Sequence, residues 1–424
     1  MIGTGIFTSL GFQVGDLPSG FAIMMLWLIG GGCALCGALC YAELATAMPR
    51  SGGEYHFLGV IYHPALGFMA GWISAIAGFA APVALAAMAF GHYLTGVWPG
   101  VSPLAASLVV VGVTTPLLLG GSRLGSGFQN ASTLLKVALV LAVIVAGFFA
   151  RSSQPISFMP QAGDGGLIVS APFAVSLVYV MFAYSGWNAS TYIAGEVRNP
   201  SRVLPLSVIV GTVVVIGLYL AVNAVFVRST PLAEMAGKVE VSLTAGPYLF
   251  GAAGTKIMAG LICLGLISTI SAMMWIGPRV MLVMGEDLRG LRWFAARNQH
   301  GIPTRATLLQ FVLVIVFLLT SSFEQVASAA MFILQACSFL TVLGVFVLRY
   351  RQPALVRPYR TWGYPVTPLL FLAVTAWMLW HILWSKPVES LIGIGTGVLG
   401  LVLYLLSTKN SPRCVPTPSN HEHD

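Results

Sequence analysis

The chain opens with Met1-Ile2-Gly3-Thr4-Gly5-Ile6-Phe7, in which two glycines flank a small hydroxyl residue among apolar neighbours. In a membrane-spanning helix, such a Gly-x-Gly sequence favours a break that frees backbone N–H groups, which is tolerated where the backbone lines a cavity. The half-helix that follows presents its positive end, so the amides of Gly3, Thr4 and Gly5 could bind a carboxylate without a charged side chain. The alternative is that Gly3 and Gly5 only permit close helix packing.

The composition identifies an integral membrane protein. Of 424 residues, 57% are hydrophobic and 8% are charged, whereas soluble domains carry about 25% charged residues. The net charge of +8 is spread over short loops, so no nucleic-acid groove is expected. Five of the six cysteines lie in apolar runs and the sixth is in the tail. No His or carboxylate accompanies the cysteines at depth, and we expect no disulfide framework, metal site or cofactor.

The apolar runs predict an all-α membrane protein with about eleven and a half spans. A span needs about 20 apolar residues, and the first segment, which ends near Phe12, is only half that long. The remaining runs are residues 21–47, 64–94, 102–120, 128–150, 170–194, 203–227, 250–277, 306–322, 325–348, 367–384 and 390–407. A short external helix is expected to start near Pro231, where it could cover an entrance.

The positive charges predict the orientation. Fifteen of the 21 Lys and Arg residues fall in loops on one side: Arg50, Arg123, Arg198, Arg202, five between 279 and 305, four between 349 and 360, Lys409 and Arg413. By the positive-inside rule this side is cytoplasmic. Both chain ends are then expected on the cytoplasmic side of the cell membrane. Membrane lipid is expected to surround the spans.

A second interruption suggests an internal repeat. Five segments after the first break, the sixth span contains Tyr184-Ser185-Gly186-Trp187-Asn188 in an otherwise apolar run. Gly-interrupted segments at corresponding positions of two halves indicate a transporter with inverted repeats and a midplane site. We therefore divide the chain into a first repeat (1–150), a second repeat (151–350), two further spans (351–410) and a disordered cytoplasmic tail (411–424).

The two breaks together suit a zwitterion. Freed carbonyls of the stretch Phe182-Ala183-Tyr184-Ser185-Gly186-Trp187-Asn188 would face the amides of the first break, and carbonyl ends attract an ammonium group. Asn188 offers a donor and an acceptor, and Phe182 could close over bound substrate as a lid. The alternative is that Phe182, Tyr184 and Trp187 are ordinary packing aromatics.

Lys136 is the one ionisable residue well inside an apolar run, residues 131–149. A charge at that depth costs at least about 2.5–3.5 kcal/mol unless it faces the bundle interior and has partners. We expect an interior role, with freed carbonyls of the first break and hydroxyls on the eighth span, such as Ser268 or Ser271, as partners. Lys136 would be a fixed cation in place of sodium or a titrating group; the alternative is snorkelling to the cytoplasmic surface.

Enzyme chemistry has little support in the sequence. No Asp or Glu lies clearly at mid-span, and Glu43 and Glu196 are near cytoplasmic helix ends, where helix-end or gate roles are expected. No phosphate loop, paired carboxylates or Ser-His-Asp set is present at depth. A receptor that binds amino acids without moving them remains open; a channel would need a polar stripe along several spans, which is absent.

Six stretches, in order, resemble the amino acid–polyamine–organocation superfamily of permeases, and most closely the L-type amino acid transporters and their bacterial relatives. The stretches are IGTGIF (2–7), YAEL (41–44) with PRSGGEY (49–55), FAYSGWN (182–188), EVRNP (196–200), GPRV (277–280), and RPYR (357–360) with GYP (363–365). They cover nearly the whole chain.

The resemblance implies a LeuT-like fold of two inverted five-helix repeats (5+5) plus two helices. It implies a carboxylate site at Gly3, Thr4 and Gly5, with the amino group on carbonyls near Ile2 and those of the second break. Phe182 would be the gating aromatic, and Lys136 matches the lysine that takes the place of a sodium site.

Two departures from the family pattern matter. Relatives carry a cytoplasmic N-terminus and half a helix before the Gly-x-Gly break, so we expect transport to need that upstream piece. Animal L-type transporters bind a heavy chain through a Cys in the loop that corresponds to residues 91–103, where this chain has none. No disulfide-linked partner is therefore expected. The resulting prediction is sodium-independent transport of neutral L-amino acids by alternating access, as exchange or, alternatively, as proton symport.

Overall fold

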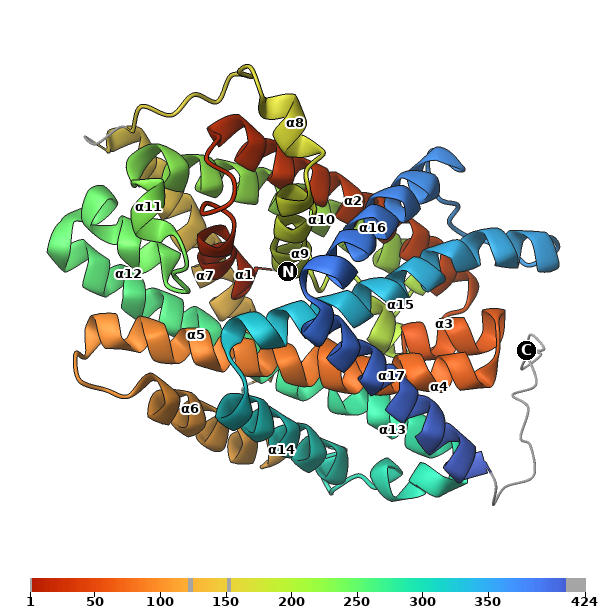
Figure 1. Ribbon diagram of the computed structural model, residues 1–424. Coiled ribbons are helices and arrows are strands. Elements are labelled where there is room, and N and C mark those ends of the chain that lie inside the picture. Colours follow the sequence, from red (N-terminus) through yellow and green to blue (C-terminus); the bar gives the residue numbers. More distant parts are fainter. Residues whose placement is uncertain (1, 121–124, 151–153, 409–424) are drawn as a thin grey trace.

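The chain is helical throughout the part that the computed structural model describes, residues 2–120, 125–150 and 154–408, with no strand in those ranges (Figure 1). In this part, eight helices are long and apolar enough to cross a membrane, and three shorter apolar helices accompany them. Together they match the eleven predicted full spans, and the chain is a multi-pass membrane protein. The helices of these spans are α2 (Gly20–Ala47), α4 (Pro64–Ile73) continued through η2 (Ser74–Ala80) into α5 (Ala81–Val97), α6 (Pro103–Leu119), α7 (Gly125–Phe149), α9 (Ala171–Tyr184), α10 (Pro200–Ser229), α12 (Val241–Ile276), α14 (Thr304–Thr320), α15 (Phe323–Arg351), α16 (Val366–Ser385) and α17 (Pro387–Thr408).

Short helices lie at the two ends of the bundle. One end carries α3 (Glu54–Ile61), α13 (Pro278–Asp287) and η4 (Arg289–Ala295); α3 and α13 are on the right of Figure 1. The other end carries α8 (Asp164–Ile168) and α11 (Leu232–Met235). The helix α11 confirms the short helix predicted near Pro231. The predicted disordered tail, 411–424, lies outside the described residues.

The interruption predicted in the sixth span is present, and the first segment is helical from Gly5 onward. The first segment consists of α1 (Gly5–Thr8) followed by the 3-10 helix η1 (Ser9–Phe12). In the sixth span, α9 ends at Tyr184, a turn follows, and the chain resumes as the 3-10 helix η3 (Ala189–Glu196). Gly186 lies in this turn with a φ of 89°. Only glycine adopts that conformation at little cost, so Gly186 fixes where α9 stops.

Long helices pack in pairs around these broken segments. The helix α5 packs along α12, and α2 packs along α10. Hydroxyl groups inside the bundle are satisfied locally: Thr212 donates to the carbonyl of Val208 at 2.7 Å, and Thr114 donates to that of Val110 at 2.6 Å. Outward faces are apolar, as on α10, where Leu206 is 61% exposed. Such faces suit contact with lipid.

Candidate functional site

The two interrupted segments meet at Gly5 and Ala183. A Cβ placed on Gly5 would lie 2.3 Å from the Cα of Ala183 and 3.0 Å from its backbone nitrogen. Real side chains do not approach a backbone so closely, so only glycine allows this contact. A second link lies nearby, where the Ser9 hydroxyl donates to the carbonyl of Tyr179 at 2.9 Å. The structure therefore brings the first break directly against the second.

Several of the predicted site residues remain partly accessible at this junction. Ile2, Gly3 and Ser185 are half-buried, whereas Phe182 and Ala183 are buried. The buried Thr4 uses its carbonyl within the first segment, accepting from the Phe7 amide at 3.0 Å and from the Thr8 hydroxyl at 3.1 Å. Asn188, also half-buried, follows the second turn and precedes η3. Residues at both breaks are thus only partly buried.

Two tyrosines that the sequence analysis missed support the first segment. The Gly3 amide donates to the hydroxyl of Tyr219, a fully buried residue of α10. The Tyr93 hydroxyl of α5 donates to the carbonyl of Phe7 at 2.8 Å and accepts from the Ser242 amide at 3.2 Å. A single tyrosine in an apolar run gives no sign in the sequence that it binds a freed backbone group on another segment.

Aromatic rings lie along one side of the junction. The Phe12 ring stacks on Tyr179, with 5.1 Å between centroids, and on Phe323, at 5.7 Å. Phe182 meets Phe323 edge to face at 6.3 Å. Phe182 therefore belongs to an aromatic group built from the first segment, α9 and α15. Trp187, by contrast, packs edge to face against Tyr41 at 4.7 Å, which is the packing role considered above.

Lys136 is interior, as predicted, and its partner is a hydroxyl of the eighth span. Its side chain is 8% exposed, and Nζ donates to the Thr269 hydroxyl of α12 at 3.0 Å. The aliphatic part of the lysine side chain passes Gly265, which lies on α12 one turn before Thr269. A hydroxyl of the eighth span was predicted as a partner, with Ser268 or Ser271 as examples, and the hydroxyl that binds Nζ is that of Thr269, on the face of α12 that also carries Gly265. Among the described residues, no acidic side chain forms an ion pair with Lys136.

Comparison with known proteins identifies the family. The Amino acid permease family matches residues 1–399 of the chain. This chain belongs to that family. It is similar to the serine/threonine exchanger SteT of Bacillus subtilis, at 25% identity over 95% of this chain and 92% of the relative. It is also similar to the human b(0,+)-type amino acid transporter 1, at 25% identity over 96% of this chain and 84% of the relative. The mouse Asc-type amino acid transporter 1 is 26% identical over 98% of this chain and 80% of its own length. The permease is a membrane transporter and not an enzyme.

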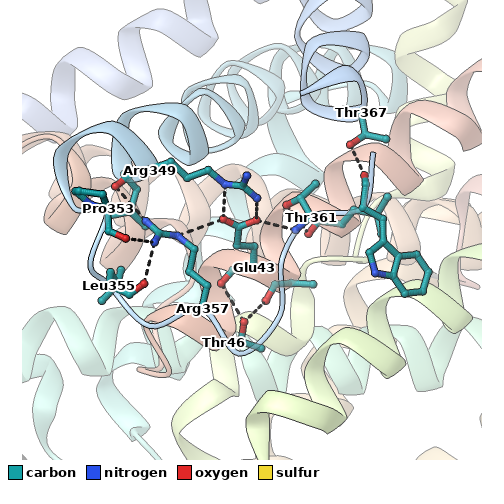
Figure 2. A network of polar contacts seen from close by, with 12 residues as sticks. Glu43, Thr46, Arg349, Pro353, Leu355, Arg357, Thr361 and Thr367 are labelled. Atoms are coloured by element: carbon teal, nitrogen blue, oxygen red, sulfur yellow. Dashed lines mark hydrogen bonds and ion pairs between the residues drawn. The ribbon is translucent and has the colours of Figure 1, made fainter. Parts of the chain in front are cut away.

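At the end of the permease that carries α3 and α13, a buried carboxylate joins two distant motifs. Glu43 of α2 is 1% exposed and accepts from Arg349 through both oxygens, at 2.9 Å and 2.6 Å (Figure 2). Its Oε2 also accepts from the Thr361 amide at 2.7 Å, and Arg357 Nε lies 3.5 Å from Oε1. Arg357 in turn donates to the carbonyl of Leu355 at 2.8 Å. The YAEL and RPYR motifs are therefore parts of one cluster.

A second cluster at the same end joins α13 to the loop before α3. Asp287 pairs with Arg50 at 2.5 Å and accepts from the Tyr55 hydroxyl at 2.8 Å. The same loop touches η3: the Gly52 amide donates to the carbonyl of Tyr192 at 3.3 Å. A Cβ on Gly53 would lie 2.8 Å from the Tyr192 ring. The PRSGGEY motif thus holds η3, the part of the sixth span that follows the break, against the bundle.

Proposed function

We propose that this permease exchanges neutral L-α-amino acids across the cell membrane without sodium, by alternating access. The observation that carries the proposal is the contact of the two interrupted segments at Gly5 and Ala183. Amide ends and carbonyl ends of broken helices at one place suit the two charged groups of an amino acid. The relatives named as a serine/threonine exchanger and as amino acid transporters support the same class of substrate.

In the proposed complex, the substrate carboxylate binds the amides of Gly3, Thr4 and Gly5. The amino group binds carbonyls of Ile2, Phe182, Ala183 and Ser185, and Asn188 stands at the edge of the site. These residues carry no charged side chain, which favours a neutral substrate. Phe182 closes over the substrate from the side of the aromatic group.

The proposed architecture follows the repeats inferred from the sequence. Residues 1–150 and 151–350 form two inverted repeats, residues 351–410 add two spans, and the end with α3 and α13 faces the cytoplasm. Lys136 serves as a fixed cation in the place of a sodium ion, held by Thr269. No disulfide-linked heavy chain is required.

The test is uptake of labelled neutral amino acids by proteoliposomes without sodium, either empty or preloaded with unlabelled amino acid. Exchange predicts uptake only into preloaded vesicles. Uptake into empty vesicles under a pH gradient would instead indicate proton symport. Proton symport is the second candidate because the partner of Lys136, the Thr269 hydroxyl, is neutral and does not fix the charge of the lysine. Saturable binding without flux, in this chain and in a version extended upstream, would overturn transport.

Replacing Lys136 by Ala is expected to reduce exchange at least about tenfold, because the cation between α7 and α12 is lost. Lys136→Arg should retain part of the activity, since it keeps the charge. Lys256→Ala, which removes an exposed lysine of α12, is the matched control and should leave exchange unchanged. Equal rates for Lys136→Ala and the control would show that Lys136 has no coupling role.

Replacing Phe182 by Ala is expected to raise the apparent KM and lower the exchange rate by roughly tenfold, because nothing then closes over the substrate. Phe182→Tyr should retain most activity, since it keeps the ring that meets Phe323. Phe148→Ala, at an 80% exposed position of α7, controls for loss of an apolar ring. Unchanged KM and rate in Phe182→Ala would refute the lid.

A further inference from the structure

Glu54 is a buried carboxyl group outside the proposed substrate site. It is the first residue of α3, and it is 1% exposed. Its Oε1 accepts from the Tyr41 hydroxyl of α2 and from the Ser338 hydroxyl of α15, the latter at 3.2 Å. Its Oε2 is buried without a hydrogen-bond partner. An ionised carboxylate with one such oxygen is costly, because the lost hydration is not replaced.

No cation compensates for this burial. Among the described residues, Glu54 forms no ion pair, in contrast to Glu43, which has two arginines close by. The titratable groups that face it are Tyr41 of α2, Tyr192 of η3 and Cys337 of α15. Each of these is neutral when protonated, so none can stabilise a negative charge by becoming positive.

The environment of Glu54 therefore favours its protonated form. Burial raises the pKa of the Glu54 carboxyl to about 7, against opposing hydrogen bonds from Tyr41 and Ser338. The neighbouring His56 does not titrate in the same range, because burial and the nearby Arg50 lower its pKa to about 4. The charge of Glu54 therefore changes near neutral pH.

The position of Glu54 links this charge to the second break. Tyr41, whose hydroxyl donates to the carboxyl group, packs against Trp187 within the break itself, and Asn188 lies close to the carboxyl group. The loop before α3 also holds η3 through Tyr192 and through the Gly195 amide, which donates to Ser51 Oγ at 3.1 Å. Water that entered between α3 and η3 would stabilise the ionised carboxylate, so ionisation favours separation of these elements.

We infer that Glu54 is a proton-binding positioning residue: protonated, it holds η3 against α3 and closes this end of the permease, and ionised, it releases η3. The inference rests on the proposed transport function for its consequence, but the proton binding itself does not. No proton needs to cross the membrane, since the same carboxyl group takes up and releases it.

The test compares the wild type with Glu54→Gln and Glu54→Asp, using amino acid exchange in preloaded proteoliposomes from about pH 5.5 to about 8.5. The wild-type rate should rise roughly fivefold through about pH 7, as the closed form loses its proton. Glu54→Gln, which mimics the protonated form, should keep the low-pH rate throughout, and Glu54→Asp should restore a transition. Glu286→Gln removes an exposed acid of α13 that pairs with Arg297, and it should behave as the wild type. A Glu54→Gln curve that follows the wild type would overturn the inference.

A second readout does not depend on transport. The pKa of Glu54 in the folded permease is above its ordinary value of 4.5, so the folded state holds a proton that the unfolded state releases. The contribution of Glu54 to the free energy of unfolding is then greatest below about pH 4.5 and falls as the pH rises to about 7. The thermal midpoint of the detergent-solubilised wild type should fall across this range relative to Glu54→Gln. Parallel curves would refute proton binding, whereas a difference without any exchange would refute only the transport function.

Discussion

Gly5→Ala is expected to lower amino acid exchange by at least about 100-fold. The added Cβ would lie 2.3 Å from the Cα of Ala183, where no rotamer change can relieve the contact. The two interrupted segments must then move apart, and the amide and carbonyl ends no longer face the same point. Exchange in proteoliposomes measures the effect, with binding of labelled amino acid as a second readout.

The matched control for this substitution is Gly32→Ala. Gly32 lies in α2, and a Cβ there would meet no atom within 4 Å. Alanine favours a helix over glycine by roughly 1 kcal/mol, so the control should fold at least as well as the wild type. Normal exchange by Gly5→Ala, with both variants eluting as monodisperse protein, would place the substrate site elsewhere.

Glu43→Gln is expected to cause the largest loss of stability among the acidic residues. Glu43 is 1% exposed and accepts hydrogen bonds from Arg349 and from the Thr361 amide, with Arg357 also close. Removing the negative partner of a buried pair costs about 3–5 kcal/mol, because the remaining charge is left unpaired. The thermal midpoint in detergent should therefore fall clearly, and the yield of folded protein should fall with it.

Glu286→Gln tests whether burial of the ion pair is the cause of the stability loss expected for Glu43→Gln. Glu286 also pairs with an arginine, Arg297, at 2.8 Å, but both side chains are about half exposed, 45% and 51%. Exposed pairs contribute about 0–1 kcal/mol, so this variant should keep nearly the wild-type midpoint. Equal losses in the two variants would mean that charge, and not the buried cluster in Figure 2, sets the stability.

The sequence predicted the features that depend on local patterns. Apolar runs gave the spans, because the bilayer sets their length, and Gly186 marked the break in the sixth span, because its positive φ is a conformation that favours glycine. The interior position of Lys136 also followed from the energetic cost of a charge in lipid. Each of these follows from a short window of residues.

Contacts between distant helices could not be predicted in the same way. Which hydroxyl faces Lys136 depends on the rotation of α12 about its axis, and one residue of rotation separates Thr269 from Ser268. The roles of Tyr93 and Tyr219 depend on which helices surround the first segment. Glu43 was expected at a helix end or gate, but its partners Arg349 and Thr361 are more than 300 residues away in sequence.

The loop after α11 lies directly on the first segment. The Gly237 amide donates to the carbonyl of Gly11 at 2.8 Å, and a Cβ on Gly11 would lie 2.0 Å from the carbonyl oxygen of Lys238. Lys238 itself is exposed. A binder that grips this loop from the surface, such as an antibody fragment, would therefore immobilise the segment beneath it. If the first segment moves during transport as proposed, this loop is the surface site at which that motion can be blocked without occupying the proposed substrate site.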